Sequence, residues 1–459
     1  MSAVAAVAAK AAVPLAPLDE ARVRQLDMPG PRYTSYPTVP VWTPNFGAEA
    51  HARALASAGK TPLSLYVHIP FCERLCSYCG CNVVVSHDRG RAGRYLDLVA
   101  RELELVAQHL GKPRTLTRIH LGGGTPTFLD ENQLEQLWSA ITAVFSVERD
   151  AELAIEIDPV VTRREQLALL HGLGWNRLSM GVQDFDPRVQ DAVQRFQSVE
   201  DTRAMVDCAR ALGWGSVNFD LIYGLPRQTP ESWRRTIDQV IELSPDRIAA
   251  FSFAYLPALR KQQRRLPQAD LPLGAAKLEL FRIAYQRLTD AGYVPIGMDH
   301  FARPDDELAR AQAEGKLWRD FQGYTTRRDA DTVAVGVTGI SRVGGAFAQN
   351  VKSLTDYRVA IELGQLPTER GHVLSADDRE RSDIITELMC NFALELTPER
   401  RARFAPELAR LEQHASDGLC EIGPYRLEVT ALGRMFVRNL AMVFDAYLEP
   451  GKGAFSRTV

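Results

Sequence analysis

Between Ser64 and about Ser341, short runs of β-branched or apolar residues alternate with longer amphipathic segments. This alternation is typical of repeated βα units that build a parallel sheet. The strands that we expect are Leu65–Ile69, Arg118–Leu121, Leu153–Ile157, Arg177–Gly181, Val217–Ile222, Ile248–Phe253, Val294–Met298 and Val333–Ile340. Between the first two runs, apolar residues recur every three or four positions from Leu96 to Leu110, as on one buried face of a helix.

No G-x-G-x-x-G segment accompanies these units, so an α/β fold with an open or partial TIM-type barrel is favoured over a doubly wound dinucleotide-binding sheet. In a barrel, functional groups gather at the carboxyl ends of the strands. Polar or glycine-rich segments lie at the predicted strand ends: Cys72–Cys81, Gly122–Pro126, Glu156 with Asp158, Gln183 with Asp184, and Asp220. We expect these segments to meet on one face.

Three cysteines, Cys72, Cys76 and Cys79, form a C-x3-C-x2-C motif after the first predicted strand. Three thiolates on one short loop can bind three irons of a cubane cluster and leave the fourth iron without a protein ligand. A zinc knuckle is the alternative, but structural zinc needs a fourth ligand, usually from a second Cys/His pair. The sequence has no second pair with that spacing, so these three cysteines are the predicted metal ligands.

Composition limits the cellular setting and the partners. Seven cysteines among 459 residues do not resemble the dense framework of a secreted disulfide protein, so we expect a reducing cytoplasm. The formal net charge of −3 gives no general attraction for nucleic acid. No uninterrupted run of 18 apolar residues predicts a membrane span. We expect a monomer.

Four regions are predicted along the chain. Residues 1–27 are alanine-rich and are expected to form a disordered tail, because Lys10 interrupts the apolar run that a secretory signal would need. Residues 28–63 form an N-terminal arm, 64–345 the barrel, and 346–459 a mostly helical, winged-helix-like C-terminal domain. After about Asn350 we expect helices without intervening strands, until a short strand leads into a helix capped by Thr430.

The cysteine motif, with Tyr78 before its last cysteine, resembles that of the radical S-adenosylmethionine (SAM) enzymes. In that superfamily the motif binds a 4Fe–4S cluster, and SAM chelates the open iron. Further segments resemble the oxygen-independent coproporphyrinogen III oxidase family over nearly the whole chain from residue 28. They are PRYTSYPT at 31–38, YVHIPFC at 66–72, CGCN at 79–82, GGGTPT at 122–127, MGVQDF at 180–185, DLIYGLP at 220–226 and GMDHFARPDD at 297–306.

The resemblance implies an oxidoreductase of anaerobic haem biosynthesis. It would convert two propionates of coproporphyrinogen III to vinyl groups and yield protoporphyrinogen IX, using one cluster, two SAM molecules and an unidentified electron donor. No catalytic residue beyond the cluster and the SAM site is implied. The residues implied to contact SAM are Tyr66, Tyr78, Gly123, Gly124, Thr125, Glu156, Gln183, Arg195, Asp220, Ala254 and Ile340.

Some of these residues have other interpretations when taken alone. The glycines at 122–124 could form a phosphate loop, but the Lys-Ser/Thr ending of a Walker motif is absent. Arg195 could be a surface residue paired with Asp191. Cys81 is expected to be a non-ligand beside the cluster. For the substrate carboxylates we select Arg32 and Arg303, because arginine offers a bidentate fork; ordinary surface salt bridges are the alternative.

A haem-binding chaperone related to these enzymes is the second hypothesis. Such proteins keep the three-cysteine motif but usually carry an aromatic residue where Cys81 stands, together with a His-Asn-x-x-Tyr-Trp segment that this sequence lacks. A third possibility is a zinc or iron–sulfur structural protein. That reading leaves the polar residues at the strand ends without a role.

Overall fold

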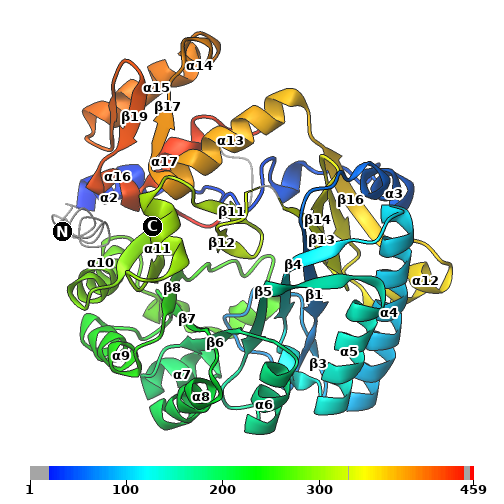
Figure 1. Ribbon diagram of the computed structural model, residues 1–459. Coiled ribbons are helices and arrows are strands. Elements are labelled where there is room, and N and C mark those ends of the chain that lie inside the picture. The colour runs from blue at the N-terminus through cyan, green and yellow to red at the C-terminus, as the bar shows by residue number, and fades with distance from the viewer. Residues whose placement is uncertain (1–19, 329, 449–454, 459) are drawn as a thin grey trace.

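The computed structural model of the protein describes residues 20–328, 330–448 and 455–458. Its centre is a 12-stranded sheet that curves around the middle of the molecule (Figure 1). The strand order is β16 (Thr368–Val373), β15 (Ala346–Asn350), β14 (Ile340–Val343), β13 (Asp331–Val335), β1 (Leu63–Ile69), β4 (Thr115–Gly123), β5 (Ser146–Ile157), β6 (Arg177–Gln183), β7 (Ser216–Tyr223), β8 (Arg247–Ser252), β10 (His300–Ala302) and β9 (Val294–Gly297).

All neighbouring strands from β13 to β8 are parallel, whereas the strands at both edges are antiparallel. β9 and β16 stand at opposite ends of the strand order, so the sheet is an open, partial barrel of the α/β class, as predicted. The prediction of one strand over Val333–Ile340 is wrong. A turn divides this run into β13 and β14, and Gly336 in the turn has φ +92°.

Helices cover the outer face of the sheet (Figure 1). They are α4 (Arg89–Leu110), α5 (Glu131–Val144), α6 (Arg164–Gly172), α7 (Pro187–Val193), α8 (Val199–Leu212), α9 (Pro230–Leu243) and α10 (Ala275–Asp290). The apolar stripe predicted from Leu96 to Leu110 is buried along α4, as expected. Each crossover helix therefore covers the sheet with its apolar side and leaves the strand ends to the loops.

Shorter elements complete the barrel region. β2 (Phe71–Cys72) pairs with β3 (Val84–Val85), and β11 (Trp318–Asp320) pairs with β12 (Gly323–Thr325). The 3-10 helices η1 (Val39–Val41), η2 (Pro126–Phe128), η3 (Lys261–Arg265) and η4 (Gln268–Asp270) lie in loops. The helices α3 (Ala48–Ser57) and α11 (Glu307–Ala313) lie beside the sheet edges, and α12 (Leu354–Glu362) packs against α4.

The C-terminal region combines helices with a small antiparallel sheet. Its helices are α13 (Ala376–Asn391), α14 (Pro398–Arg403), α15 (Ala405–Ser416), α16 (Ala431–Met435) and α17 (Val437–Met442), and its strands are β17 (Ala393–Glu395), β18 (Cys420–Ile422) and β19 (Arg426–Val429). Thr430 caps α16 as predicted. The short strand expected before Thr430 is β19, but the expectation of helices alone between Asn350 and that strand is wrong, because β16, β17 and β18 intervene. The large sheet also crosses the boundary predicted after residue 345.

The two ends of the described chain lie together. Residues 20–26, expected to belong to a disordered tail, form helix α2 (Glu20–Leu26), in which Val23 and Leu26 are buried; residues 1–19 lie outside the described residues. Pro29 pairs with Arg457 in an antiparallel bridge, and the guanidinium of Arg438 on α17 donates to the carbonyl of Gly30. The N-terminal arm is therefore fixed by the last residues of the chain.

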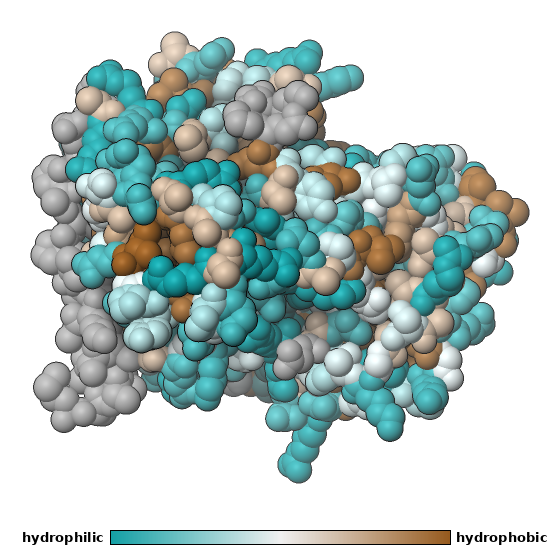
Figure 2. All heavy atoms as spheres, turned by 90° about the horizontal axis from the view of Figure 1, so that it is seen from above, coloured by the Kyte–Doolittle hydropathy of each residue, from teal (hydrophilic) through white to brown (hydrophobic). Residues whose placement is uncertain are grey.

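The surface seen in Figure 2 is largely hydrophilic, with hydrophobic side chains gathered in small groups. Within the described residues, no helix is both long and apolar enough to cross a bilayer.

Candidate active site

A cavity of about 520 Å³ opens at the carboxyl ends of the parallel strands. Most of the residues that the sequence analysis singled out line it together. They are Cys72, Cys76, Tyr78, Cys79, Gly123, Gly124, Thr125, Glu156, Gln183, Arg195, Asp220 and Ala254. The structure thus brings segments separated by almost two hundred positions to one face of the sheet, as the barrel prediction requires.

The three thiols occupy the loop that starts in β2. The thiol of Cys72 lies 3.6 Å from the hydroxyl of Thr125, and the guanidinium of Arg195 lies 3.9 Å from the sulfur of Cys76. The backbone N–H of Cys81 donates to the sulfur of Cys79 at 3.4 Å. Each sulfur therefore has a hydrogen-bonding neighbour, which suits thiolates that ligate a metal group.

A single metal ion and a cubane cluster require different positions of the three thiols. In the described part of the chain, no three thiol, imidazole or carboxylate groups converge on a point that a single ion would occupy, as a mononuclear site demands. A cubane cluster instead takes each thiolate at a different iron. The residues present therefore fit the cluster.

Neighbouring elements hold the thiol loop in place. The buried Ser77 donates its N–H to the carbonyl of Val193 at the end of α7. Gln262 and Gln263 of η3 donate side-chain hydrogen bonds to the carbonyls of Cys79 and Tyr78, at 2.6 and 3.1 Å. The loop thus touches protein on two sides while its sulfurs face the cavity.

The cysteines differ in their tendency to ionise. The hydrogen bond from the Cys81 thiol, helped by the charge of Arg260 and against the effect of burial, lowers the pKa of Cys79 to about 7. Burial raises the pKa of Cys72 to about 11. Cys81 is exposed. Its N–H donates to the sulfur of Cys79, and its role as a non-ligand neighbour stays a prediction.

The glycines at the end of β4 pack against the thiol loop. Gly123 has φ +116°, and a Cβ atom there would lie 2.5 Å from the ring of His68. A Cβ atom on Gly124 would lie 2.7 Å from the carbonyl oxygen of Phe71, and the N–H of Thr125 donates to that same oxygen. Only glycine permits this close approach of two backbone segments.

Glu156 lies near the end of β5 with its carboxylate in the cavity. The carboxylate accepts from Nε2 of His120 at 3.0 Å and from the N–H of Gly123 at 3.1 Å. Its side chain is 41 % accessible because it faces the cavity, although protein surrounds it. Burial favours its neutral form, but the hydrogen bond and charge of His120 outweigh burial and lower the pKa of Glu156.

Asp220 lies on β7, two strands from Glu156 in the sheet, and its pKa shifts in the opposite direction. Burial and the neighbouring charge of Glu156 raise the pKa of Asp220 to about 6, although Ser179 and Asn218 donate to its carboxylate. The site therefore combines one carboxylate that stays ionised with another that can hold a proton near neutral pH.

Arg195 is buried in the wall rather than exposed on a helix. Its guanidinium pairs with Asp158 at 3.0 Å and also donates to the carbonyl of Gly181. Asp191, the partner in the alternative reading, pairs instead with Arg227. The surface-pair interpretation of Arg195 is wrong.

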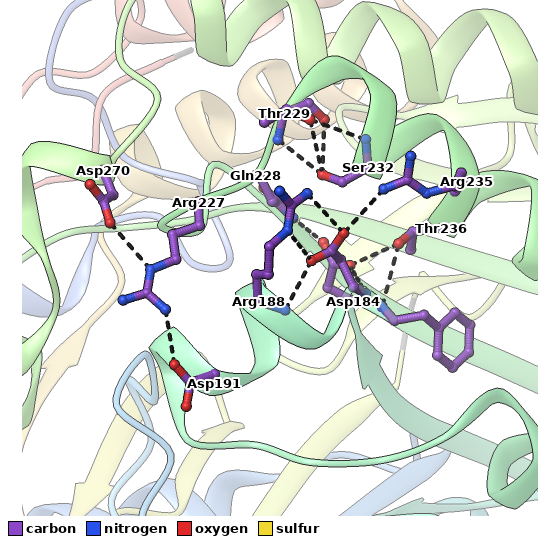
Figure 3. A network of polar contacts seen from close by, with 12 residues as sticks. Asp184, Arg188, Asp191, Arg227, Gln228, Thr229, Ser232, Arg235, Thr236 and Asp270 are labelled. Atoms are coloured by element: carbon purple, nitrogen blue, oxygen red, sulfur yellow. Dashed lines mark hydrogen bonds and ion pairs between the residues drawn. The ribbon is translucent and has the colours of Figure 1, made fainter.

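The turn that carries Gln183 rests on a polar network (Figure 3). The buried carboxylate of Asp184 accepts from the hydroxyl of Thr236 at 2.7 Å and from the amide of Gln228 at 2.6 Å. Burial raises the pKa of Asp184 to about 6. Gln183 itself has φ +65°. The network fixes the turn at an uncommon backbone conformation, with the side chain of Gln183 beside the cavity.

Four predicted residues do not line this cavity. Tyr66 lies behind it, with its ring stacked on His120 at a centroid distance of 5.7 Å. Ile340 lines a separate small cavity with Tyr33 and Phe347. Arg303 donates to the carbonyls of Ser244 and Pro245, at the amino end of β8, so the structure does not bring it to the site.

Arg32, the fourth, lies between the barrel and α17. It pairs with Asp299 at 2.6 Å and lies over the ring of Phe251, 5.6 Å from its centroid. Phe251 lines the main cavity, so its ring lies between Arg32 and that cavity. Arg32 and Arg438 share a neighbouring cavity of about 30 Å³.

Two parts of the site, His120 and the loop around η3, were not predicted from the sequence. His120, which holds Glu156, stands two residues after Arg118 on β4. This period-2 placement of polar residues in an apolar strand is a signal for a lumen-facing position. The loop around η3, which supplies Arg260 and Gln263, has no comparable signal, because it follows neither a helical nor a strand period.

Comparison with known proteins gives consistent results. Residues 66–240 match the family model of the radical SAM superfamily. The chain is 44% identical over 449 residues to an oxygen-independent coproporphyrinogen III oxidase of Pseudomonas aeruginosa, covering 95% of this chain and 98% of that protein. It is 44% identical over 438 residues to the Escherichia coli protein of the same description, covering 94% and 96%.

A solved structure shares the architecture. It is the coproporphyrinogen III oxidase of Escherichia coli, described as a radical SAM enzyme; it has 44% sequence identity and a TM-score of 0.89, and the alignment covers 94% of this chain and 99% of that one.

Proposed function

The chain belongs to the oxygen-independent coproporphyrinogen III oxidases of the radical SAM superfamily, and on that basis we propose that it converts two propionates of coproporphyrinogen III to vinyl groups. The product is protoporphyrinogen IX, formed without oxygen in haem biosynthesis. The observation that carries the proposal is the meeting of the C-x3-C-x2-C thiols with Glu156, Arg195 and Asp220 in one cavity. Membership of the superfamily implies a 4Fe–4S cluster and SAM. That two SAM molecules bind remains part of the proposal.

Cys72, Cys76 and Cys79 would hold the cluster. When bound and reduced, the cluster and SAM together supply a 5′-deoxyadenosyl radical that can remove a hydrogen atom from an unactivated propionate carbon. The protein's task is to position the reactants and exclude water. Arg195 supports this task by placing positive charge beside the sulfur of Cys76, where negative charge is concentrated.

The placement of the cavity residues supports the SAM contacts that we propose. Exposed backbone at Gly123–Thr125 can accept from the methionyl amino group, and Glu156, kept ionised by His120, offers it a carboxylate. Gln183 and Asp220 can bind ribose hydroxyls, whereas Ala254 would act through its backbone. Tyr66 would act indirectly by packing on His120.

Arg32 is the better supported of the two substrate candidates. It lies next to Phe251 of the main cavity, on an arm fixed by the C-terminal segment. A substrate propionate could replace Asp299, or lie beside it, and accept two hydrogen bonds from the guanidinium of Arg32. Arg303 has only its sequence context in its favour. The monomeric state and the cytoplasmic location also stay predictions.

The test is anaerobic reconstitution followed by two assays. The proposal expects SAM cleavage together with conversion of coproporphyrinogen III to protoporphyrinogen IX. Tight haem binding without turnover would instead support the chaperone hypothesis, and a stable zinc complex that forms no cluster would support a structural role. For the replacement of a proposed cluster ligand, such as Cys79→Ser, the matched control is Cys208→Ser, since Cys208 lies on α8, away from the thiol loop.

A further inference from the structure

Five basic residues lie on two segments that help to line the cavity, the thiol loop and the segment of η3. This cationic rim consists of Arg74, Arg260, Lys261, Arg264 and Arg265. Arg74 and Arg260 line the cavity, and the side chains of the rim other than Arg260 are exposed. The whole chain has a formal charge of −3, so the rim is a local excess of positive charge on an acidic protein.

The charges of the rim are not matched by neighbouring acids. In the part of the chain that the structure describes, none of the five forms an ion pair, whereas nearby carboxylates already have partners. Glu73 pairs with Arg89 at 2.9 Å. Asp191 and Asp270 both pair with Arg227 (Figure 3). Most of the positive charge of the rim is therefore left for a partner.

The rim is physically joined to the thiol loop. Gln262 and Gln263 of η3, which lie between Lys261 and Arg264, donate to the backbone carbonyls of Cys79 and Tyr78. Apolar side chains lie among the cations, since Leu75 is 39% and Leu259 60% exposed. Apolar contact area within a charged surround is the usual composition of a protein–protein interface.

We propose that the cationic rim is the docking surface for an acidic, one-electron donor protein. The inference rests on the proposed function, because reductive cleavage of SAM consumes one electron. That electron leaves the donor, which is oxidised by one equivalent, and reduces the bound cluster. Electron transfer weakens steeply with distance, and a protein seated on the rim lies directly against the loop that carries the cluster ligands.

Charge complementarity makes the interaction sensitive to salt. Opposite charges raise the association rate at low ionic strength, and salt screens exposed charges over about 10 Å. A small inorganic reductant needs no docking surface. A comparison of SAM cleavage rates with a protein donor and with an inorganic reductant therefore distinguishes a defect in docking from a defect in the reaction itself.

The experiment uses the reconstituted holoenzyme and follows SAM cleavage, and it also measures the dissociation constant for the donor protein, which the test variant should raise by about tenfold at low salt. One arm uses a small acidic flavoprotein, flavodoxin in its hydroquinone state, and the other uses dithionite. The test variant is Arg264→Glu combined with Arg265→Glu, and the matched control is Arg203→Glu on the exposed side of α8. We expect the test variant to lower the second-order rate with flavodoxin by about tenfold or more at low salt. The dithionite-driven rate and the control variant should be unchanged.

Each other outcome counts against the proposal. Equal losses with both donors would show damage to the site, and an unchanged flavodoxin rate would show that the rim is not used. A raised KM for coproporphyrinogen III in the dithionite arm would assign the rim to the tetracarboxylate substrate. If the wild-type enzyme cleaved no SAM even with dithionite, the proposed function itself would fail, and the donor surface with it.

Discussion

Cys79 has separate partners for its sulfur and for its carbonyl. The sulfur accepts from the backbone of Cys81, and the carbonyl accepts from Gln262. Replacement of Cys79 by serine leaves the carbonyl contact intact but removes a soft ligand. We expect Cys79→Ser to lower SAM cleavage by more than about a hundredfold while the protein stays folded. Iron content, visible absorbance and cleavage rate test this; full activity would show that the ligand assignment is wrong.

Asp184 gives a prediction for the dependence of stability on pH. The folded-state pKa of about 6 lies above the unfolded value, so the stabilisation from binding its proton is present below about pH 4 and is lost as the pH rises through 6. Asp184→Asn removes this dependence. Between pH 4 and pH 7, the unfolding free energy of the variant relative to the wild type should rise by about 2 kcal/mol.

Denaturant unfolding of the apoprotein at several pH values measures that difference. Asp201→Asn is a suitable control, because Asp201 is exposed and its pKa is lowered rather than raised. A constant difference across the pH range would contradict the burial argument for Asp184.

Single residues at the site were predictable where chemistry and position agreed. The cysteine spacing and the polar residues at strand ends identified the thiols, Glu156, Gln183 and Asp220 of the cavity lining, whereas the family resemblance alone implied Arg195 and Ala254. Arg195 was not predictable from its local context, because its partner Asp158 lies 37 positions away and only the fold brings them together. Likewise, the sequence placed Arg303 near a motif but could not show that the motif turns towards the amino end of β8.

Among the elements, the turn after β4 is the most restricted by sterics. Gly123→Ala would place a methyl group against the ring of His68 and force a side chain into φ +116°. We expect the glycine turn to shift and kcat/KM for SAM to fall by about tenfold to a hundredfold. Gly172→Ala is the matched control, since no atom lies within 4 Å of a Cβ added there. Equal effects of both substitutions would show that the turn has no special role.

The parallel strands were predictable because they are buried, short and regularly spaced. The error at Val333–Ile340 has a physical reason. The run is continuous in apolar character, yet Gly336 allows a turn in which Val337 donates its N–H to the hydroxyl of Tyr95 on α4. A contact from so distant a helix leaves no pattern in the local sequence. The edge strands β15 and β16 were missed, because antiparallel additions lack the βα alternation.

At the scale of the molecule, the C-terminal segment fixes the N-terminal arm. Gly30 donates to the carbonyl of Ser456 at 3.0 Å, Thr458 donates to that of Met28 at 2.8 Å, and Arg457 pairs with Asp27. Deletion of residues 449–459 would remove these contacts. If Arg32 binds a propionate, the apparent affinity for coproporphyrinogen III falls in proportion to the fraction of molecules whose arm holds Arg32 in its observed position. We expect a KM for coproporphyrinogen III raised by about tenfold, with kcat little changed.

Steady-state kinetics of the truncated and full-length enzymes distinguish this effect from a general loss of structure. SAM cleavage with dithionite is the internal control, because none of the deleted residues that the structure describes, 455–458, lines the main cavity. An unchanged KM would show that the arm needs no support from the C-terminus. The pairing of the two ends could not be predicted, because it joins residues more than 400 positions apart with no periodic signal.

The same pairing sets an order of events during synthesis. Residues 455–458 leave the ribosome after every strand of the large sheet, since the last of these strands in the chain ends at Val373. The sheet and its thiol loop can therefore form while the arm near Gly30 still lacks its partner. Arg32 on this arm therefore gains its final support only after residues 455–458 have been made, later than the strands that hold the thiol loop.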